Sequence, residues 1–200
     1  MNVKNALLLS LPLLCLAFAA TAPAQIAYDG FDGPGNGKHI VLIAGDEEYR
    51  TEESLPMLGQ ILAKPYGFKC TVIFSIDPDT GFINPNNQEN LPGLEALDSA
   101  DMMIIGTRFR NPPNDDMKHI DDFVHSGKPI LGLRCTVLGF RYPKDRQDSP
   151  YAEYDTGSAK GGFGTIVLGE KWRGHHGHHK VESTRGLVNG RYRSHPILRG

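Results

Sequence analysis

The sequence has little cysteine, little tryptophan and almost no net charge. Only three of its 200 residues are cysteine and one is tryptophan, while 21 Lys and Arg face 23 Asp and Glu. So few cysteines exclude a small scaffold held together by disulfides. A formal net charge of −2 gives no electrostatic reason to expect a nucleic acid or an anionic membrane as partner. We therefore expect a small-molecule ligand, and the composition is compatible with a homo-oligomer.

The apolar stretch near the N-terminus is too short to span a membrane. It covers residues 6–20, contains Pro12 and follows Lys4, and no basic cluster comes after it, whereas a span needs ~20 apolar residues. Small residues at Ala22-Pro23-Ala24 complete the pattern of a secretory signal. We predict that residues 1–24 are a signal peptide cleaved after Ala24. The protein would then be secreted or periplasmic, with no stable membrane anchor.

The remaining chain is predicted to be one domain after a short leader. Residues 25–37 are rich in glycine and are expected to form a flexible leader. Residues 38–200 are expected to form a single α/β domain. The sequence ends without a recognisable closing helix or strand, which predicts a domain that is C-terminally incomplete.

Apolar runs alternate with amphipathic stretches through most of this domain. Strands are predicted at residues 39–44, 69–74, 101–105, 129–133 and 164–168. Helices are predicted to begin at Thr51 and at Asn114, with a short helical stretch near 91–97. This alternation predicts a doubly wound, mostly parallel flavodoxin-like sheet with helices on both faces and its first two strands exchanged. Because two strands would then separate Cys70 from Cys135, both are expected to be free thiols.

Ligands of such sheets bind at the carboxyl ends of the strands. Three strands place polar residues there, namely Asp46, Glu47 and Glu48, then Thr107, Arg108 and Arg110, then Arg134, Cys135 and Thr136. Carboxylates beside arginines could bind a polyol or exchange protons. Two plainer interpretations stay open: residues 46–48 could compensate the dipole of the following helix, and Arg108 could hold neighbouring carbonyl groups.

A histidine cluster at His175-His176-Gly177-His178-His179 is the densest group of metal-ligating residues. Neutral imidazoles bind zinc and copper. Side chains alternate along an extended chain, so His176 with His178, or His175 with His179, could share one ion. A divalent metal such as zinc held by His176 and His178 is one hypothesis. A solvated loop or a single catalytic histidine is the alternative.

Four segments together resemble the ThuA-like, or trehalose-utilisation, family. They are His39-Ile-Val-Leu-Ile-Ala-Gly45, Ala100-Asp-Met-Met-Ile-Ile-Gly106, Gly127-Lys-Pro-Ile-Leu-Gly-Leu-Arg134 and Trp172-Arg-Gly-His-His-Gly-His178-His179. The resemblance implies involvement with carbohydrate, such as trehalose, and a fold like that of class I glutamine amidotransferases. Those enzymes carry a Gly-x-Cys-x-Gly turn whose cysteine attacks an amide.

This chain departs from that turn. Gly132-Leu133-Arg134-Cys135 places arginine where the nucleophile belongs and cysteine one residue later. A guanidinium stays protonated and cannot be a nucleophile. No Gly-x-Gly-x-x-Gly follows a strand, so an intrinsic dinucleotide site is not supported.

Three functional hypotheses follow. In the first, Glu48, Arg134 and His176 are catalytic and Asp46, Arg108, Cys135 and Thr136 contact the substrate, so that the domain binds or modifies a trehalose-like sugar or related polyol. In the second, the domain recognises carbohydrate without catalysis. In the third, Cys135 is the nucleophile of an amidotransferase-like hydrolase, because a helix N-terminus lowers the pKa of a thiol.

Overall fold

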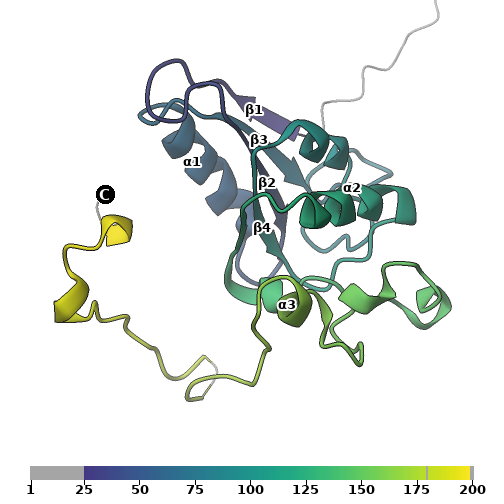
Figure 1. The fold of residues 1–200 in the computed structure, drawn as a ribbon. Helices are drawn as coiled ribbons and strands as arrows, with labels where there is room; N and C mark the ends of the chain where they lie inside the picture. Colours follow the sequence, from purple (N-terminus) through teal and green to yellow (C-terminus); the bar gives the residue numbers. More distant parts are fainter. Residues whose placement is uncertain (1–24, 179, 199–200) are drawn as a thin grey trace, which may run out of the picture.

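A five-stranded, mostly parallel mixed sheet forms the centre of the protein (Figure 1). The computed structural model describes residues 25–178 and 180–198. The sheet has the order β1-β3-β2-β4-β5. Its parallel strands are β2 (His39–Gly45), β3 (Lys69–Phe74), β4 (Met102–Thr107) and β5 (Ile130–Gly132), and β1 (Gln25–Tyr28) pairs antiparallel with β3.

Helices cover both faces of this sheet because successive residues of a buried strand point to opposite sides. Ile40 and Leu42 of β2 pack with Leu55 of α1 (Thr51–Ala63) on one face. Val41 and Ile43 belong to the core on the other face, where α2 (Asn114–His125) and the 3₁₀ helix η1 (Leu94–Ser99) lie. The four predicted parallel strands are thus present, and the first two are exchanged as expected.

Residues 25–28 correct the prediction of a flexible leader over 25–37. They form strand β1, with Gln25 opposite Ile73 and Tyr28 opposite Cys70. Pairing with the outer edge of β3 satisfies backbone groups that would otherwise be exposed. The glycine-rich remainder of the leader runs beside the end of α1, where Gly35 donates its N–H to the carbonyl of Tyr66.

The predicted strand at 164–168 is wrong, because this segment begins as the short helix α3 (Gly162–Ile166). Phe163 is completely buried, with its ring centroid 5.1 Å from that of Phe140 and 5.7 Å from that of Tyr154. This aromatic cluster fixes a compact turn instead of an extended strand. Leu168 packs over Gly132, so α3 supports the end of β5.

Helix α1 begins at Thr51 as predicted, whereas the short helical stretch begins later than predicted. Thr51 is of a residue type that often caps helices, but the N-cap is Arg50, which adopts a left-handed conformation with φ of 52°. Thr51 instead accepts a hydrogen bond from the Asp46 N–H and donates one to the carbonyl of Gly106. The helical stretch predicted near 91–97 is η1, which begins at Leu94. Thr51 thereby ties the loop after β2 to β4.

The remaining regular structure consists of short 3₁₀ turns. They are η2 (Arg134–Leu138), η3 (Lys144–Arg146), η4 (Ala152–Tyr154), η5 (Gly190–Tyr192) and η6 (Pro196–Leu198). After α3 the chain leaves the body as an extended, exposed segment, drawn from green to yellow in Figure 1.

Some of the sequence predictions concern residues that the structure does not describe. The predicted signal peptide, its cleavage site at Ala24 and residue His179 of the histidine cluster lie outside the described residues. Within 25–178 and 180–198, no helix has the length and apolar character needed to cross a bilayer.

Candidate functional site

The loop after β2 is organised by the buried carboxyl group of Asp46. Its Oδ1 accepts the N–H groups of Glu48 at 2.9 Å and Tyr49 at 3.2 Å. Its Oδ2 is buried without a hydrogen-bond partner in the described part of the chain. Burial raises the pKa of Asp46 above its ordinary value. Asp46 therefore shapes the loop that presents Glu47, Glu48 and Tyr49.

The acidic and basic residues at the strand ends neutralise one another. Glu48 lies 3.2 Å from Arg108, and Glu47 contacts Arg108 and lies 2.6 Å from Arg110. The Arg110 side chain is fully buried and also donates to the carbonyl groups of Asn87, Pro85 and Arg108. Prediction placed Arg108 and Glu48 in the site together, and the structure does bring them together. Because the two side chains form an ion pair, fewer of their hydrogen-bonding groups remain for a ligand.

Arg134 stands at the tip of the turn after β5. Leu133 is still extended, and Arg134, the first residue of η2, adopts a left-handed conformation with φ of 50°. A non-glycine residue in this conformation is uncommon and marks a strained turn. The Arg134 guanidinium stacks on the Tyr49 ring at 4.0 Å from its centroid. The tip of the turn thus carries a cation that meets the loop after β2.

Cys135 is only half-buried and its environment disfavours the thiolate. Burial and then the carboxylates of Asp46 and Glu48 raise the pKa of Cys135. Both Cys70 and Cys135 are free thiols, as predicted. The raised pKa runs against the depression expected from a helix N-terminus, because a short 3₁₀ turn has little dipole to offer against two nearby carboxylates.

Thr136 is placed inside the protein. Its hydroxyl lies 2.8 Å from the carbonyl oxygen of Ile105 and 2.6 Å from that of Leu133, and it accepts the N–H of Thr107. Thr136 is 1% exposed. It joins the ends of β4 and β5, so its hydroxyl positions the turn and does not face a ligand.

A cavity of about 330 Å³ lies between these strand ends and the segment 172–184. The body contributes Tyr49, Arg134 and Cys135. The segment contributes Trp172, Gly174, His175, His176, His178, Lys180, Glu182 and Thr184. The cavity is open and mostly polar, and it lies at the carboxyl edge where the sequence predicted a site.

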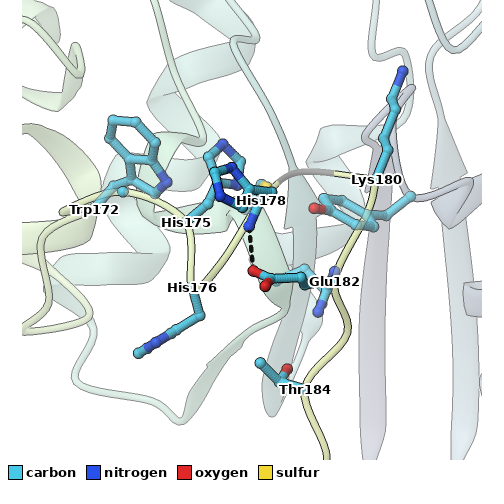
Figure 2. A pocket seen from close by; sticks show the side chains of 11 residues that line it. Trp172, His175, His176, His178, Lys180, Glu182 and Thr184 are labelled. Carbon is cyan, nitrogen blue, oxygen red and sulfur yellow. Dashed lines mark hydrogen bonds between the residues drawn. The ribbon is translucent and has the colours of Figure 1, made fainter.

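Figure 2 shows how the side chains of this segment lie. The rings of Trp172 and His175 meet edge to face, 5.7 Å between centroids. The backbone N–H of His178 donates to Glu182 at 2.6 Å. His176 points away from Glu182. His176 and Glu182 therefore do not point toward a common ion.

The side chains that the structure describes are not grouped as a metal centre requires. Across residues 25–178 and 180–198, no three His, Cys, Asp or Glu side chains are placed to hold one ion. A structural zinc site is four-coordinate and a catalytic one uses three protein ligands. No step of the chemistry is therefore assigned to a metal.

The structure gathers some predicted residues and separates others. Arg134, Cys135 and His176 share the cavity, whereas Glu48 and Arg108 pair beside it and Thr136 lies beneath it. Tyr49, Lys180 and Glu182 also line the cavity and are not among the residues that the sequence indicates, whereas His175 belongs to the histidine cluster that it does indicate. Tyr49 could have been found because it follows Glu48 in the same loop, but no local pattern indicates that Lys180 and Glu182 would fold back beside Arg134.

Comparison of the chain with protein-family models, with curated proteins and with solved structures gives no match.

Proposed function

We propose that this protein is an exported ThuA-like domain that binds a carbohydrate in the cavity at the carboxyl edge of its sheet. The order of the parallel strands, β3-β2-β4-β5, supports a flavodoxin-like arrangement of the class I glutamine amidotransferase-like type. The segments that resemble the ThuA-like family include β2, β4, β5 and residues 172–179. Two of these four segments line the cavity: the segment of β5 through Arg134, and residues 172–179 through Trp172 and the histidines.

One observation carries the proposal: an indole ring and polar hydrogen-bond donors line the same open cavity. Trp172 is 47% exposed, and Tyr49 lies in the opposite wall with Arg134 stacked on it. Aromatic faces contact the apolar faces of sugar rings, while guanidinium and imidazole N–H groups donate to hydroxyl oxygens. In this role Arg134 and His176 orient the sugar, and Asp46 holds the loop that carries Tyr49.

Binding is better supported than turnover. Glu48, the predicted proton-transfer group, is already paired with Arg108. An attack by Cys135 would need its thiolate, and burial and nearby carboxylates raise the pKa of that thiol. Recognition of a carbohydrate without catalysis is therefore preferred over the hydrolase.

The single tryptophan of the chain gives a direct test. Because Trp172 lines the cavity, its fluorescence should change in a saturable manner when trehalose or another disaccharide binds. Arg134→Ala and His176→Ala should weaken binding, whereas His125→Ala, an exposed substitution at the end of α2, should not. Unchanged sugar affinity in both cavity variants, or no saturable response to any mono- or disaccharide, would overturn the proposal.

Turnover and export are tested separately. Mass spectrometry of the sugar after incubation should show no product if the domain only recognises its ligand.

N-terminal sequencing of protein recovered from the medium or periplasm should begin at Gln25. Recovery of the uncleaved chain in the cytoplasm alone would contradict export.

A further inference from the structure

The charge of the protein is divided very unevenly along the chain. Residues 25–170 contain 13 Lys and Arg against 22 Asp and Glu, whereas residues 171–198 contain six Lys and Arg against one Glu. The near-neutral total therefore hides an acidic body and a basic segment. An anion approaching the body is repelled except where the basic segment lies.

The cavity lies where this basic segment meets the body. Its lining includes two permanent cations, Arg134 and Lys180, and a single carboxylate, Glu182. Glu182 already accepts the N–H of His178 and packs against Gly177 within the same turn. Three histidines add further N–H donors. The lining is thus rich in donors and poor in acceptors.

Arg134 is available to a ligand. Among the described residues it forms no ion pair, and its guanidinium stacks on the Tyr49 ring. Stacking holds the guanidinium plane by its face and leaves its N–H edge free to bind an anion. This differs from Arg108 and Arg110, whose guanidinium groups are occupied by Glu47 and Glu48.

Lys180 supplies the second cation from the opposite wall. It forms no ion pair with any carboxylate that the structure describes, and in Figure 2 its side chain extends away from Glu182. A lysine side chain is long and has three rotatable donors, so its ammonium group can turn toward a charged ligand. Arg134 and Lys180 line the same cavity, so both charges attract an anionic group that enters it.

We infer that the cavity selects a sugar bearing an anionic group, a carboxylate or a phosphate, over the neutral sugar. The inference rests on the proposed carbohydrate function and specifies its ligand. Trp172 contacts the ring, and Arg134 with Lys180 binds the anion. Charge-assisted hydrogen bonds to a guanidinium are stronger than those between neutral groups, so the anionic sugar should bind about tenfold more tightly.

The test compares three ligands of one ring size by the fluorescence of Trp172. Glucose, glucuronate and glucose 6-phosphate are titrated at low ionic strength. At least one of the anionic sugars should bind about tenfold more tightly than glucose, and the tighter one identifies the anionic group. The advantage should shrink at high salt, because the cavity is open to solvent.

Two variants connect the preference to the cavity. Arg134→Gln and Lys180→Gln should each reduce the preference for the anionic sugar. Lys180→Gln should largely keep the affinity for glucose, whereas Arg134→Gln should also weaken glucose binding, because Arg134 orients the sugar. Arg141→Gln is the matched control, because Arg141 also stacks on an aromatic ring, 5.4 Å from the centroid of Phe109, but does not line this cavity. Lys180 is exposed, so its variant should fold even if Arg134→Gln does not.

The outcomes separate this inference from the proposed function. If glucose binds as tightly as both anionic sugars, the inference fails and the carbohydrate function stands. If none of these sugars nor a disaccharide binds, the carbohydrate function itself fails. A preference that persists in both Gln variants would also overturn the inference, since other groups would then supply the charge.

Discussion

Arg110 and Glu47 form an ion pair whose cationic member is completely buried, with 2.6 Å between Nη2 and Oε2. Burial lowers the pKa of Arg110, and Glu47 opposes that change. The guanidinium also binds the carbonyl groups of Pro85 and Asn87. The pair therefore fastens the loop after β2 to the loop that follows β3.

Removing the charge of Glu47 should destabilise the fold. Glu47→Gln leaves a buried guanidinium without its counter-ion, and loss of a charge-assisted hydrogen bond costs about 2 kcal/mol. Glu53→Gln is the control, because the ion pair of Glu53 with Arg50 is largely exposed and should contribute less than about 1 kcal/mol. Urea unfolding measures both. Equal losses of stability would show that the buried pair has no special role.

The sequence predicts the sheet well because long buried strands leave a clear signal. Residues 40–45 and 70–74 are buried throughout and almost entirely apolar, and both faces of the sheet are covered. It predicts α3 poorly, because the apolar residues Ile166, Val167 and Leu168 resemble a strand until the burial of Phe163 is known. The sequence does not indicate strand β1, because its four residues are too few to show an alternation of apolar and polar side chains and a glycine-rich segment follows them.

The cavity lies at the edge of the sheet where the sequence predicts a site, but its lining includes residues that the sequence does not indicate. Topology alone brings the ends of parallel strands together, so Asp46, Arg108 and Arg134 follow from the fold. Whether Arg108 is free or paired depends on side-chain contacts that no spacing reveals. The wall formed by residues 172–184 depends on how an irregular segment returns to the body, which local sequence does not specify.

Helix α3 is expected to tolerate no added methyl group at Gly164. A Cβ there would lie 2.6 Å from the carbonyl oxygen of Val137 and 2.7 Å from that of Glu170, which are backbone atoms. Gly164→Ala should therefore cost about 1–3 kcal/mol, in the range of overpacked cores. Gly186→Ala is the control, because its Cβ would meet no atom within 4 Å. Identical melting temperatures for the two variants would contradict the packing of α3 against η2.

His39 should make the fold less stable in mild acid. Burial, and next the charge of Lys69, lowers the pKa of His39 below 6.5, and its Nε2 lies 2.9 Å from the Thr71 hydroxyl. The unfolded chain then takes up a proton more readily than the folded one. Its contribution to stability is complete above pH 6.5 and declines as the pH falls below that value.

His39→Gln removes this titration. The free energy of unfolding of the wild type, measured at steps from pH 8 to pH 5.5, should fall more steeply below about pH 6.5 than that of the variant. The values at pH 8 serve as the reference, because both side chains are neutral there. Parallel curves for the two proteins would exclude His39 as a source of the acid sensitivity.

Cys135 should react slowly with iodoacetamide near neutral pH, and Cys70 more slowly still. Cys70 is fully buried, and burial raises its pKa to about 11. Cys135 is half-buried, so reagent can reach it, but its raised pKa keeps it mainly in the thiol form. Mass spectrometry of labelled peptides should show a rate at Cys135 that rises with pH across the alkaline range.

The negative charge of Asp46 contributes to the low reactivity of Cys135, and a substitution can remove that charge. Asp46→Asn keeps an oxygen for the N–H groups of Glu48 and Tyr49 but removes the negative charge, which should lower the pKa of Cys135 and speed its labelling severalfold. Asp122→Asn on the exposed face of α2 should leave the rate unchanged. If wild-type Cys135 instead labels rapidly at pH 7 and Asp46→Asn has no effect, the thiol is activated, and the cysteine hydrolase replaces sugar binding as the better explanation of this site.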